Sequence, residues 1–259
     1  MKKYSKDSWF LFISQIITHL SLVPMIIYGA WYHWLIAFIV YFFTGCFGMT
    51  MTFHRLLSHK SWKAPRWFEI FGTLCGTYGL TGSSVGWTAI HRQHHHKTDI
   101  VGDPHSPEID GFIKVQWFSM FVTPNPKYAV HLLRDKVHMF LHNYYYHIHA
   151  GLLIIWLLYD PMLTLAAYLI PACILWNAGS AINTLNHLSG YRLHDTKDNS
   201  ANNFLTGYLM WGEGWHNNHH HNPNNKSFKT KWWEIDIGGW LIERIDTTTI
   251  DSNKNTNTA

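Results

Sequence analysis

Two long stretches of the chain are almost entirely apolar, and each is interrupted once near its middle. The first covers residues 9–53, with a break at 28–30. The second covers about 144–188, with a break at 160–161. Each half of the first stretch is close to the roughly 20 residues that a helix needs to cross a bilayer core. The pattern predicts four transmembrane helices in two hairpins, at about 9–28, 31–53, 144–159 and 161–187.

The polar segments between these stretches carry histidines at a repeated spacing. The segment HRQHH at 91–95 places three histidines at i, i+3 and i+4, and HNNHH at 216–220 repeats that interval. On a helix, such side chains project from one face toward one point, and neutral imidazole is a common ligand of iron, zinc, copper and nickel. A third pair, His54 and His59, is spaced differently. The pattern predicts a metal centre.

The histidines are too numerous for a single catalytic ion. A first-row ion takes about four to six ligands, and a catalytic ion leaves at least one position open. The three clusters therefore favour two metals. The five-residue step from His54 to His59 turns an α-helix by about 140°, so these two need not serve the same ion. One could bind each metal, or the helix could end between them.

An apolar, glycine-rich segment at 67–90 lies between two of the histidine clusters. If it crossed the membrane, His54 and His91 would lie on opposite sides of the bilayer. We therefore expect an interfacial or re-entrant helix at about 67–85.

Lysine and arginine flank the histidine-bearing ends of the apolar segments, whereas the turns at 28–30 and 159–161 carry neither. Because cytoplasmic loops carry an excess of these residues, both termini and every histidine cluster are predicted to face the cytoplasm. This bias and anionic headgroups account for the net charge of +4. No basic face interleaved with aromatic residues indicates nucleic acid.

Composition supports a membrane protein. Aromatic residues make up 16% of the chain and charged residues 14%, against about a quarter charged in soluble proteins. No linker or repeat divides the 259 residues, so we expect one domain at 1–246 and a disordered polar tail at 247–259. The three cysteines lie apart in apolar surroundings, which argues against disulfides or a thiolate site.

Four motifs together resemble the boxes of the membrane-bound fatty acid desaturases, the family of stearoyl-CoA desaturase and its bacterial relatives. They are HRLLSH at 54–59, HRQHH at 91–95, DPHSP at 103–107 and GEGWHNNHH at 212–220, in the order and at the separations of that family. The resemblance covers nearly the whole chain. It implies an all-α integral membrane protein with a cytoplasmic, histidine-rich helical cap that holds two irons.

The resemblance also implies a ligand set. In the element NTLNHLSG, the histidine would bind one iron and Asn183 would reach the other through a water. His96 and His221 extend their boxes by one position and are expected to lie outside the set. The nine implied histidine ligands of the two Fe2+ ions are His54, His59, His91, His94, His95, His187, His216, His219 and His220.

The implied reaction is insertion of a cis double bond, at the delta-9 position, into a saturated acyl chain with reduction of O2 to water. Removing two hydrogens from unactivated methylenes requires dioxygen activated on a redox metal. We expect Asp99, Asp103 and Glu213 to fix the tautomers of the ligating imidazoles. A dry tunnel would hold the chain, and its expected lining residues are Phe38, Tyr41, Phe42, Thr52 and Trp87.

Three alternatives stand beside this interpretation. A membrane di-iron hydroxylase of alkyl chains or lipids uses similar boxes, but the DPHSP element and the Asn183 to His187 pair favour a desaturase. A membrane metal carrier or store should have polar residues throughout its spans, whereas the histidines here lie at the cytoplasmic ends of the predicted spans. The predicted spans themselves argue against a soluble zinc hydrolase. The acyl carrier is left open among coenzyme A, acyl carrier protein and a glycerolipid. We expect the electrons to come from a separate ferredoxin or b-type cytochrome.

Overall fold

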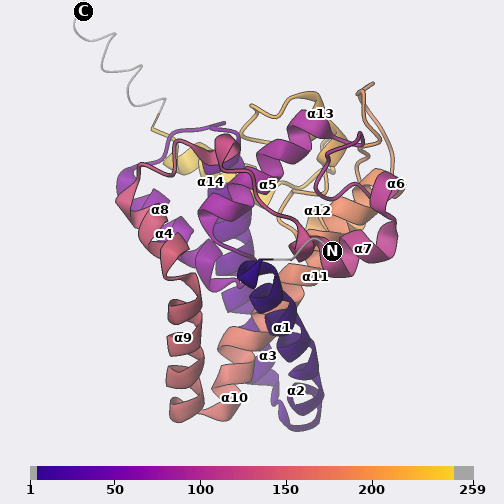
Figure 1. Ribbon diagram of the computed structural model, residues 1–259. Helices are drawn as coiled ribbons and strands as arrows, with labels where there is room; N and C mark the ends of the chain where they lie inside the picture. The colour runs from indigo at the N-terminus through magenta and orange to yellow at the C-terminus, as the bar shows by residue number, and fades with distance from the viewer. Residues whose placement is uncertain (1–4, 248–259) are drawn as a thin grey trace, which may run out of the picture.

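The structure, a computed structural model, describes residues 5–247. Every regular element among these residues is helical, and the only strand-like pairings are isolated bridges of Asn202 with Tyr191 and with Trp215. The all-α prediction is therefore confirmed for this part of the chain. Apart from Thr247, the predicted disordered tail lies outside the described residues. Long helices extend from one side of a cap of shorter helices (Figure 1).

The first apolar stretch forms a helical hairpin with its turn at the predicted break. Helices α1 (Lys6–Leu20) and α2 (Leu22–Tyr28) follow one another as one apolar rod of 23 residues. After Gly29 and Ala30 the chain returns as α3 (Trp31–Phe42). This helix continues without a break into a π-helix, η1 (Phe43–Ser58), so the rod is 28 residues long and ends five residues later than expected.

The second stretch forms another hairpin, from α9 (Tyr145–Tyr159) to α11 (Ile170–Leu188). The return begins with α10 (Pro161–Thr164) and a short π-helix, η4 (Leu165–Leu169). Asp160 caps the N-terminus of α10 by accepting hydrogen bonds from the backbone N–H of Met162 at 2.7 Å and of Leu163 at 2.9 Å. Proline suits the first turn of a helix, which explains why the break falls at Pro161.

Three helical rods among the described residues are long and apolar enough to cross a membrane: Lys6–Tyr28, Trp31–Ser58 and Pro161–Leu188. A helix, α9, occupies the position of the third expected span, but its 15 residues reach only about 22 Å, less than the roughly 30 Å of a bilayer core. Large apolar side chains on these helices point outward, with Trp31 exposed at 75% and Leu158 at 83%. Such surfaces suit contact with lipid.

The segment between the second rod and the next histidine cluster forms two helices, where we expected one at about 67–85. Helix α4 (Arg66–Tyr78) stops at Gly79, and α5 (Ser84–Lys97) begins after Ser83 accepts a hydrogen bond from Gly86 N. Between them Leu80 and Gly82 have φ of 59° and 105°. These left-handed conformations cannot continue a right-handed helix, so the predicted helix was seven residues too long.

The cap closes over the ends of the rods. Its buried core contains Phe53, Phe68 and Ile242, which come from η1, α4 and the last helix, so widely separated segments share one interior. Besides α4 and α5, the cap helices are α6 (Pro107–Asp110), α7 (Phe112–Phe118), η2 (Ser119–Phe121), η3 (Pro126–Ala129), α8 (Lys136–Asn143), α12 (Phe204–Leu209), α13 (His216–His221) and α14 (Ile237–Ile245).

Candidate metal centre

The structure gathers all nine predicted histidines into two adjacent clusters. Within each cluster one nitrogen of every histidine lies within 4.8 Å of a nitrogen of each other member. The larger cluster, called the five-histidine cluster, contains His54, His59, His91, His95 and His219. The smaller, called the four-histidine cluster, contains His94, His187, His216 and His220.

Each of the two HxxHH motifs divides its histidines between the two clusters. On α5, His91 and His95 join the five-histidine cluster, whereas His94 joins the four-histidine cluster. On α13, His219 joins the five-histidine cluster, and the other two histidines of the motif join the four-histidine cluster. Successive residues on a helix differ by about 100° in direction, so each helix divides its imidazoles between two neighbouring sites.

The π-helix η1 explains why His54 and His59 belong to the same cluster. In a π-helix the backbone N–H bonds to the carbonyl five residues earlier, and His59 N donates to His54 O at 3.1 Å. The wider turn brings residues five apart onto one face, and their ring centroids lie 4.9 Å from each other. The helix also ends at Ser58, so His59 is its C-cap.

The three predicted carboxylates each meet the Nδ1 atom of a clustered histidine. His94 Nδ1 lies 3.0 Å from both oxygens of Asp103. His187 Nδ1 lies 3.0 Å from Asp99 Oδ2, and His54 Nδ1 donates to Glu213. An ionised carboxylate only accepts hydrogen bonds, so each of these imidazoles carries its proton on Nδ1. The Nε2 lone pair is then available to a metal.

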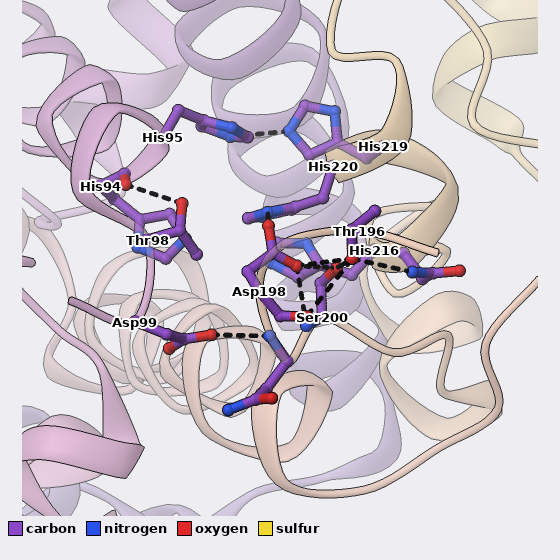
Figure 2. Close-up of polar contacts among 12 residues, drawn as sticks. His94, His95, Thr98, Asp99, Thr196, Asp198, Ser200, His216, His219 and His220 are labelled. Carbon is purple, nitrogen blue, oxygen red and sulfur yellow. Dashed lines mark hydrogen bonds and ion pairs between the residues drawn. The ribbon is translucent and has the colours of Figure 1, made fainter. Parts of the chain in front are cut away.

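Sequence reasoning missed a fourth carboxylate, Asp198. Its Oδ2 lies 2.8 Å from His220 Nδ1, while its Oδ1 accepts hydrogen bonds from Thr196 Oγ1 at 2.8 Å and Ser200 N at 3.0 Å (Figure 2). It stands in the loop DTKDNS, 22 residues before its histidine. No motif spacing links the two, so only the folded loop reveals the contact.

The carboxyl groups of Asp99, Asp103 and Asp198 are held in their charged form, and His91 is neutral. Burial opposes ionisation of Asp103 more than any other single effect, but the hydrogen bond from His94 and the further interactions with His94 and His105 together outweigh it and lower the pKa of this carboxyl to about 2. The pKa values of Asp99 and Asp198 are likewise held far below the ordinary range, because the effect of burial is outweighed by several interactions together, chiefly the hydrogen bonds from His187 and His220. Burial lowers the pKa of His91, which keeps its imidazole neutral.

The arrangement of the ring nitrogens fits a pair of cations. His54 Nε2 lies 3.0 Å from His219 Nε2, and His187 Nε2 lies 3.1 Å from His216 Nε2. Because carboxylates hold the protons of His54 and His187 on Nδ1, their Nε2 atoms present lone pairs to these neighbours. Neutral imidazole nitrogens in convergent sets of five and four are typical ligands of first-row metals.

A buried arginine that the sequence did not single out supports the five-histidine cluster. Arg55 is fully buried and pairs with Glu213 at 3.1 Å and with Asp236 at 2.9 Å. Its guanidinium carbon lies 3.8 Å from the centre of the Phe228 ring. Glu213 therefore contacts Arg55 through one oxygen and His54 through the other. The arginine balances the charge of this carboxylate and fixes its direction.

A cavity of about 390 Å³ reaches both clusters. Its wall includes His54 and His91 of the five-histidine cluster and His216 of the four-histidine cluster. Asn183, one turn before His187 on α11, also lines it. A long apolar molecule in this space would lie against the nitrogens of both sites.

Of the five residues expected to line a tunnel, only Trp87 does so. Phe38 and Phe42 instead pack on Trp211 of the cap, with ring centroids 6.1 and 4.9 Å away. The Tyr41 hydroxyl donates to Leu209 O at 2.6 Å. Thr52 is buried against Gly72 of α4. These four residues join the second rod to the cap, and the expectation that they face the cavity was wrong.

Comparison with known proteins identifies the family. The fatty acid desaturase family model matches residues 29–237. The chain is 33% identical over 221 residues to the sn-1 stearoyl-lipid 9-desaturase of Anabaena variabilis, covering 81% of this chain and 79% of that protein. It is 34% identical to the sn-2 palmitoyl-lipid 9-desaturase of Nostoc sp. (strain 36), with 83% and 76% covered.

A plant protein also matches. The chain is 31% identical to the acyl-CoA C20 Delta5-desaturase of Anemone leveillei, with 84% of this chain and 72% of that protein covered. The residues matched by the family model, 29–237, include every histidine of the two clusters. The chain therefore belongs to the fatty acid desaturase family, whose members are metal-dependent oxidoreductases of lipid metabolism.

Proposed function

We propose that the protein inserts a cis double bond at the delta-9 position of a saturated acyl chain, using O2 at a centre of two irons. The observation that carries this proposal is the cavity of about 390 Å³, which is lined by histidines of both clusters. The position of the double bond is supported by the names of two similar proteins, which are 9-desaturases of stearoyl-lipid and palmitoyl-lipid.

The two histidine clusters would each hold one iron. The five-histidine cluster would supply five imidazoles and the four-histidine cluster four, and Asn183, which lines the same cavity, would act through a water. Bound there, the irons would supply activated oxygen that takes two hydrogens from adjacent methylenes. This chain's own contribution is geometric, because Asp99, Asp103, Asp198 and Glu213 hold the Nδ1 protons and thereby aim the Nε2 atoms.

Apolar walls would hold the acyl chain away from water. Met49 of the second rod, Leu175 of α11 and Trp87 of α5 all line the cavity, and Trp87 stacks on His91 with ring centroids 4.8 Å apart. A chain held between these side chains presents one segment to the histidines, and exclusion of water protects the oxidant from side reactions.

We also propose the membrane arrangement predicted from the sequence: four spans in two hairpins, one domain at 1–246, and the cap and both termini in the cytoplasm. In this arrangement α9 crosses as the third span, and local thinning of the bilayer accommodates its short length. Its packing supports this assignment, since Trp156 joins the buried cluster around Tyr168 and Leu169. Electrons would reach the cap from a separate ferredoxin or b-type cytochrome.

The fatty acids of a host that lacks its own desaturase test the proposal. We expect expression of the protein, with a reductant supplied, to yield a cis-9 monounsaturated acid detectable among fatty acid methyl esters. A His94→Ala variant should yield none, because it removes a nitrogen of the four-histidine cluster. Hydroxylated acids would contradict the proposal in favour of a hydroxylase.

A further inference from the structure

One buried histidine beside the clusters belongs to neither of them. His105 is the histidine of the motif DPHSP at 103–107, and it is 6% exposed. Its ring stacks on that of His94, with centroids 4.3 Å apart and an angle of 29° between the planes. His105 also lines the cavity that reaches both clusters. It therefore lies next to the four-histidine cluster, on the wall that an incoming molecule meets.

The position of His105 is fixed by the carboxylate that also holds His94. Asp103 Oδ1 accepts a hydrogen bond from His105 N at 3.0 Å, and Asp103 Oδ2 accepts one from Asp99 N at 2.8 Å. Both oxygens lie 3.0 Å from His94 Nδ1. Pro104, between the two residues of this turn, restricts the backbone further. His105 is thus held at a defined place relative to His94.

The Nδ1 atom of His105 is buried, yet it has no hydrogen-bond partner among residues 5–247. A buried polar group without a partner is unfavourable, and in native proteins such a group commonly contacts a water, an ion or a ligand. In the same part of the chain, the other histidines with a buried, unpartnered ring nitrogen are His149 of α9 and His94, His216, His219 and His220 of the clusters. His105 therefore shares this feature with the residues proposed to bind metal.

The four-histidine cluster leaves room for a small ligand. Its four members lie within 4.8 Å of one another, whereas His105 meets this limit with His94 and Asp103 and does not join the four. A first-row ion takes about four to six ligands, so four imidazoles leave up to two positions open. His216 of this cluster and His105 both line the cavity. A molecule that enters an open position from the cavity would meet His105.

Imidazole has the chemistry to hold such a molecule. In either neutral tautomer it carries one N–H and one lone pair. The N–H can donate to an oxygen atom, and hydrogen bonds to acceptors that carry negative charge are the strong ones. The neighbouring ring of His94 has its Nδ1 proton occupied by Asp103, so it cannot perform this task.

We propose that His105 is a positioning residue whose imidazole donates a hydrogen bond to the small oxygen-bearing ligand at the open position of the metal in the four-histidine cluster. This rests on the proposed metal centre, and it adds a residue that holds neither the metal nor the acyl chain. The hydrogen bond fixes the direction in which the small ligand is bound, as the carboxylates fix the direction of the imidazoles.

Azide binding tests this contact, because azide occupies open positions of iron and accepts hydrogen bonds. The purified protein with ferric irons is titrated with azide in detergent, and the infrared stretch of bound azide is recorded in H2O and in D2O. We expect His105→Phe to bind azide about tenfold more weakly, the scale of a lost hydrogen bond to a charged group. It should also lose the D2O shift that the unmodified protein shows.

His142→Phe is the matched control. His142 lines the same cavity, but its Nδ1 already has a partner, Ser83 Oγ at 2.7 Å. This variant should leave the azide affinity and the D2O shift unchanged. An equal loss in His142→Phe, or an unchanged azide affinity in His105→Phe, would overturn the proposal.

Two further measurements separate a hydrogen bond from other roles of His105. His105→Phe should retain about two irons per chain, and a loss of one iron would make His105 a metal ligand and overturn the proposal. The amide nitrogen of His105→Asn falls near the place of Nδ1, and that of His105→Gln near the place of Nε2. At least one of these variants should restore the D2O shift, and failure of both would also overturn the proposal.

The outcome does not depend on the product of the reaction. If azide binding responds to His105 but no double bond forms in the acyl chain, the proposed desaturation fails and the role of His105 stands. If the double bond forms and azide binding ignores His105, this role alone fails. An unmodified protein that binds no iron would overturn both.

Discussion

At the scale of single residues, the state of the centre depends on where four imidazole protons lie. Each of four carboxylates holds a proton on Nδ1 of one histidine. If the proton moved to Nε2, that nitrogen would lose the lone pair that a metal needs. The carboxylates therefore matter for metal affinity although they do not face the clusters.

Asp198→Asn should weaken iron binding at the four-histidine cluster by about 10- to 100-fold, the usual effect of losing such a partner. The amide oxygen can replace Oδ1, which accepts from Thr196 and Ser200. The amide nitrogen then faces His220 Nδ1 and, as a donor, forces the imidazole proton to Nε2. Iron content per chain after dialysis against a chelator measures this, with Asp195→Asn as control. Full iron retention would contradict the role assigned to Asp198.

Arg55→Met should lower the free energy of unfolding by about 3–5 kcal/mol, because it leaves Glu213 and Asp236 as buried charges without their partner. Arg66→Met is the matched control. Arg66 also pairs with two carboxylates, those of Glu69 and Asp135, but its side chain is 46% exposed, so about 0–1 kcal/mol is expected. Thermal unfolding in detergent would show the difference, and equal losses in the two variants would argue against it.

Residue-level prediction from the sequence was best where side chains repeat at helical spacing. The spacing of HRQHH and HNNHH, with the family resemblance, led to the nine histidines that the structure brings together. The contact between Asp198 and His220 depends on a loop conformation that no local pattern encodes. Phe38 and Phe42 were assigned to the tunnel because they lie on an apolar rod, but Phe42 packs on Trp211, which is distant in sequence, and Phe38 is exposed at 56% on the outside of the rod.

At the scale of elements, the π-helix η1 makes one rod both long and apolar enough to cross a membrane and a source of two histidines of the five-histidine cluster. Its sixteen residues are buried almost throughout, and α4 packs closely along it. The apolar pattern predicted a helix here, but amino-acid composition does not distinguish a π-helix from an α-helix. For this reason the placement of His54 and His59 in one cluster was left open by the sequence.

Gly48→Ala should destabilise the contact between η1 and α4. An added Cβ at Gly48 would lie 2.6 Å from Gly76 Cα and 2.8 Å from the Cys75 carbonyl carbon. Because these are backbone atoms, whole helices would have to move, at a cost of about 1–3 kcal/mol. Gly151→Ala on α9 meets nothing within 4 Å and serves as control. The unfolding midpoint in detergent should fall for Gly48→Ala alone, and equal midpoints would refute the close packing.

At the scale of the whole molecule, the arrangement of long rods on one side and histidines on the other determines how the protein sits in a membrane. The sequence predicted where the apolar helices break, at 28–30 and at 160–161, because breaks such as Pro161 are local signals. It placed the ends of the rods less well. The second rod continues to Ser58 because its last turns are buried in the cap and therefore need no apolar outer face.

Cysteine labelling tests the proposed topology. Single cysteines at Trp31 and Tyr159, both exposed at 75%, should react with an impermeant maleimide in intact cells, because they lie at the turns of the hairpins. Cysteines at Asp195 and Lys229 of the cap should react only after permeabilisation. Protection of the Tyr159→Cys site in intact cells would show that α9 does not cross the membrane.

The most direct test of the account is the iron content of the purified protein and of one variant for each cluster. We predict about two irons per chain in the unmodified protein. His95→Ala, in the five-histidine cluster, and His220→Ala, in the four-histidine cluster, should each retain about one. A single iron in the unmodified protein, or zinc in its place, would contradict the assignment of the two histidine clusters to two irons.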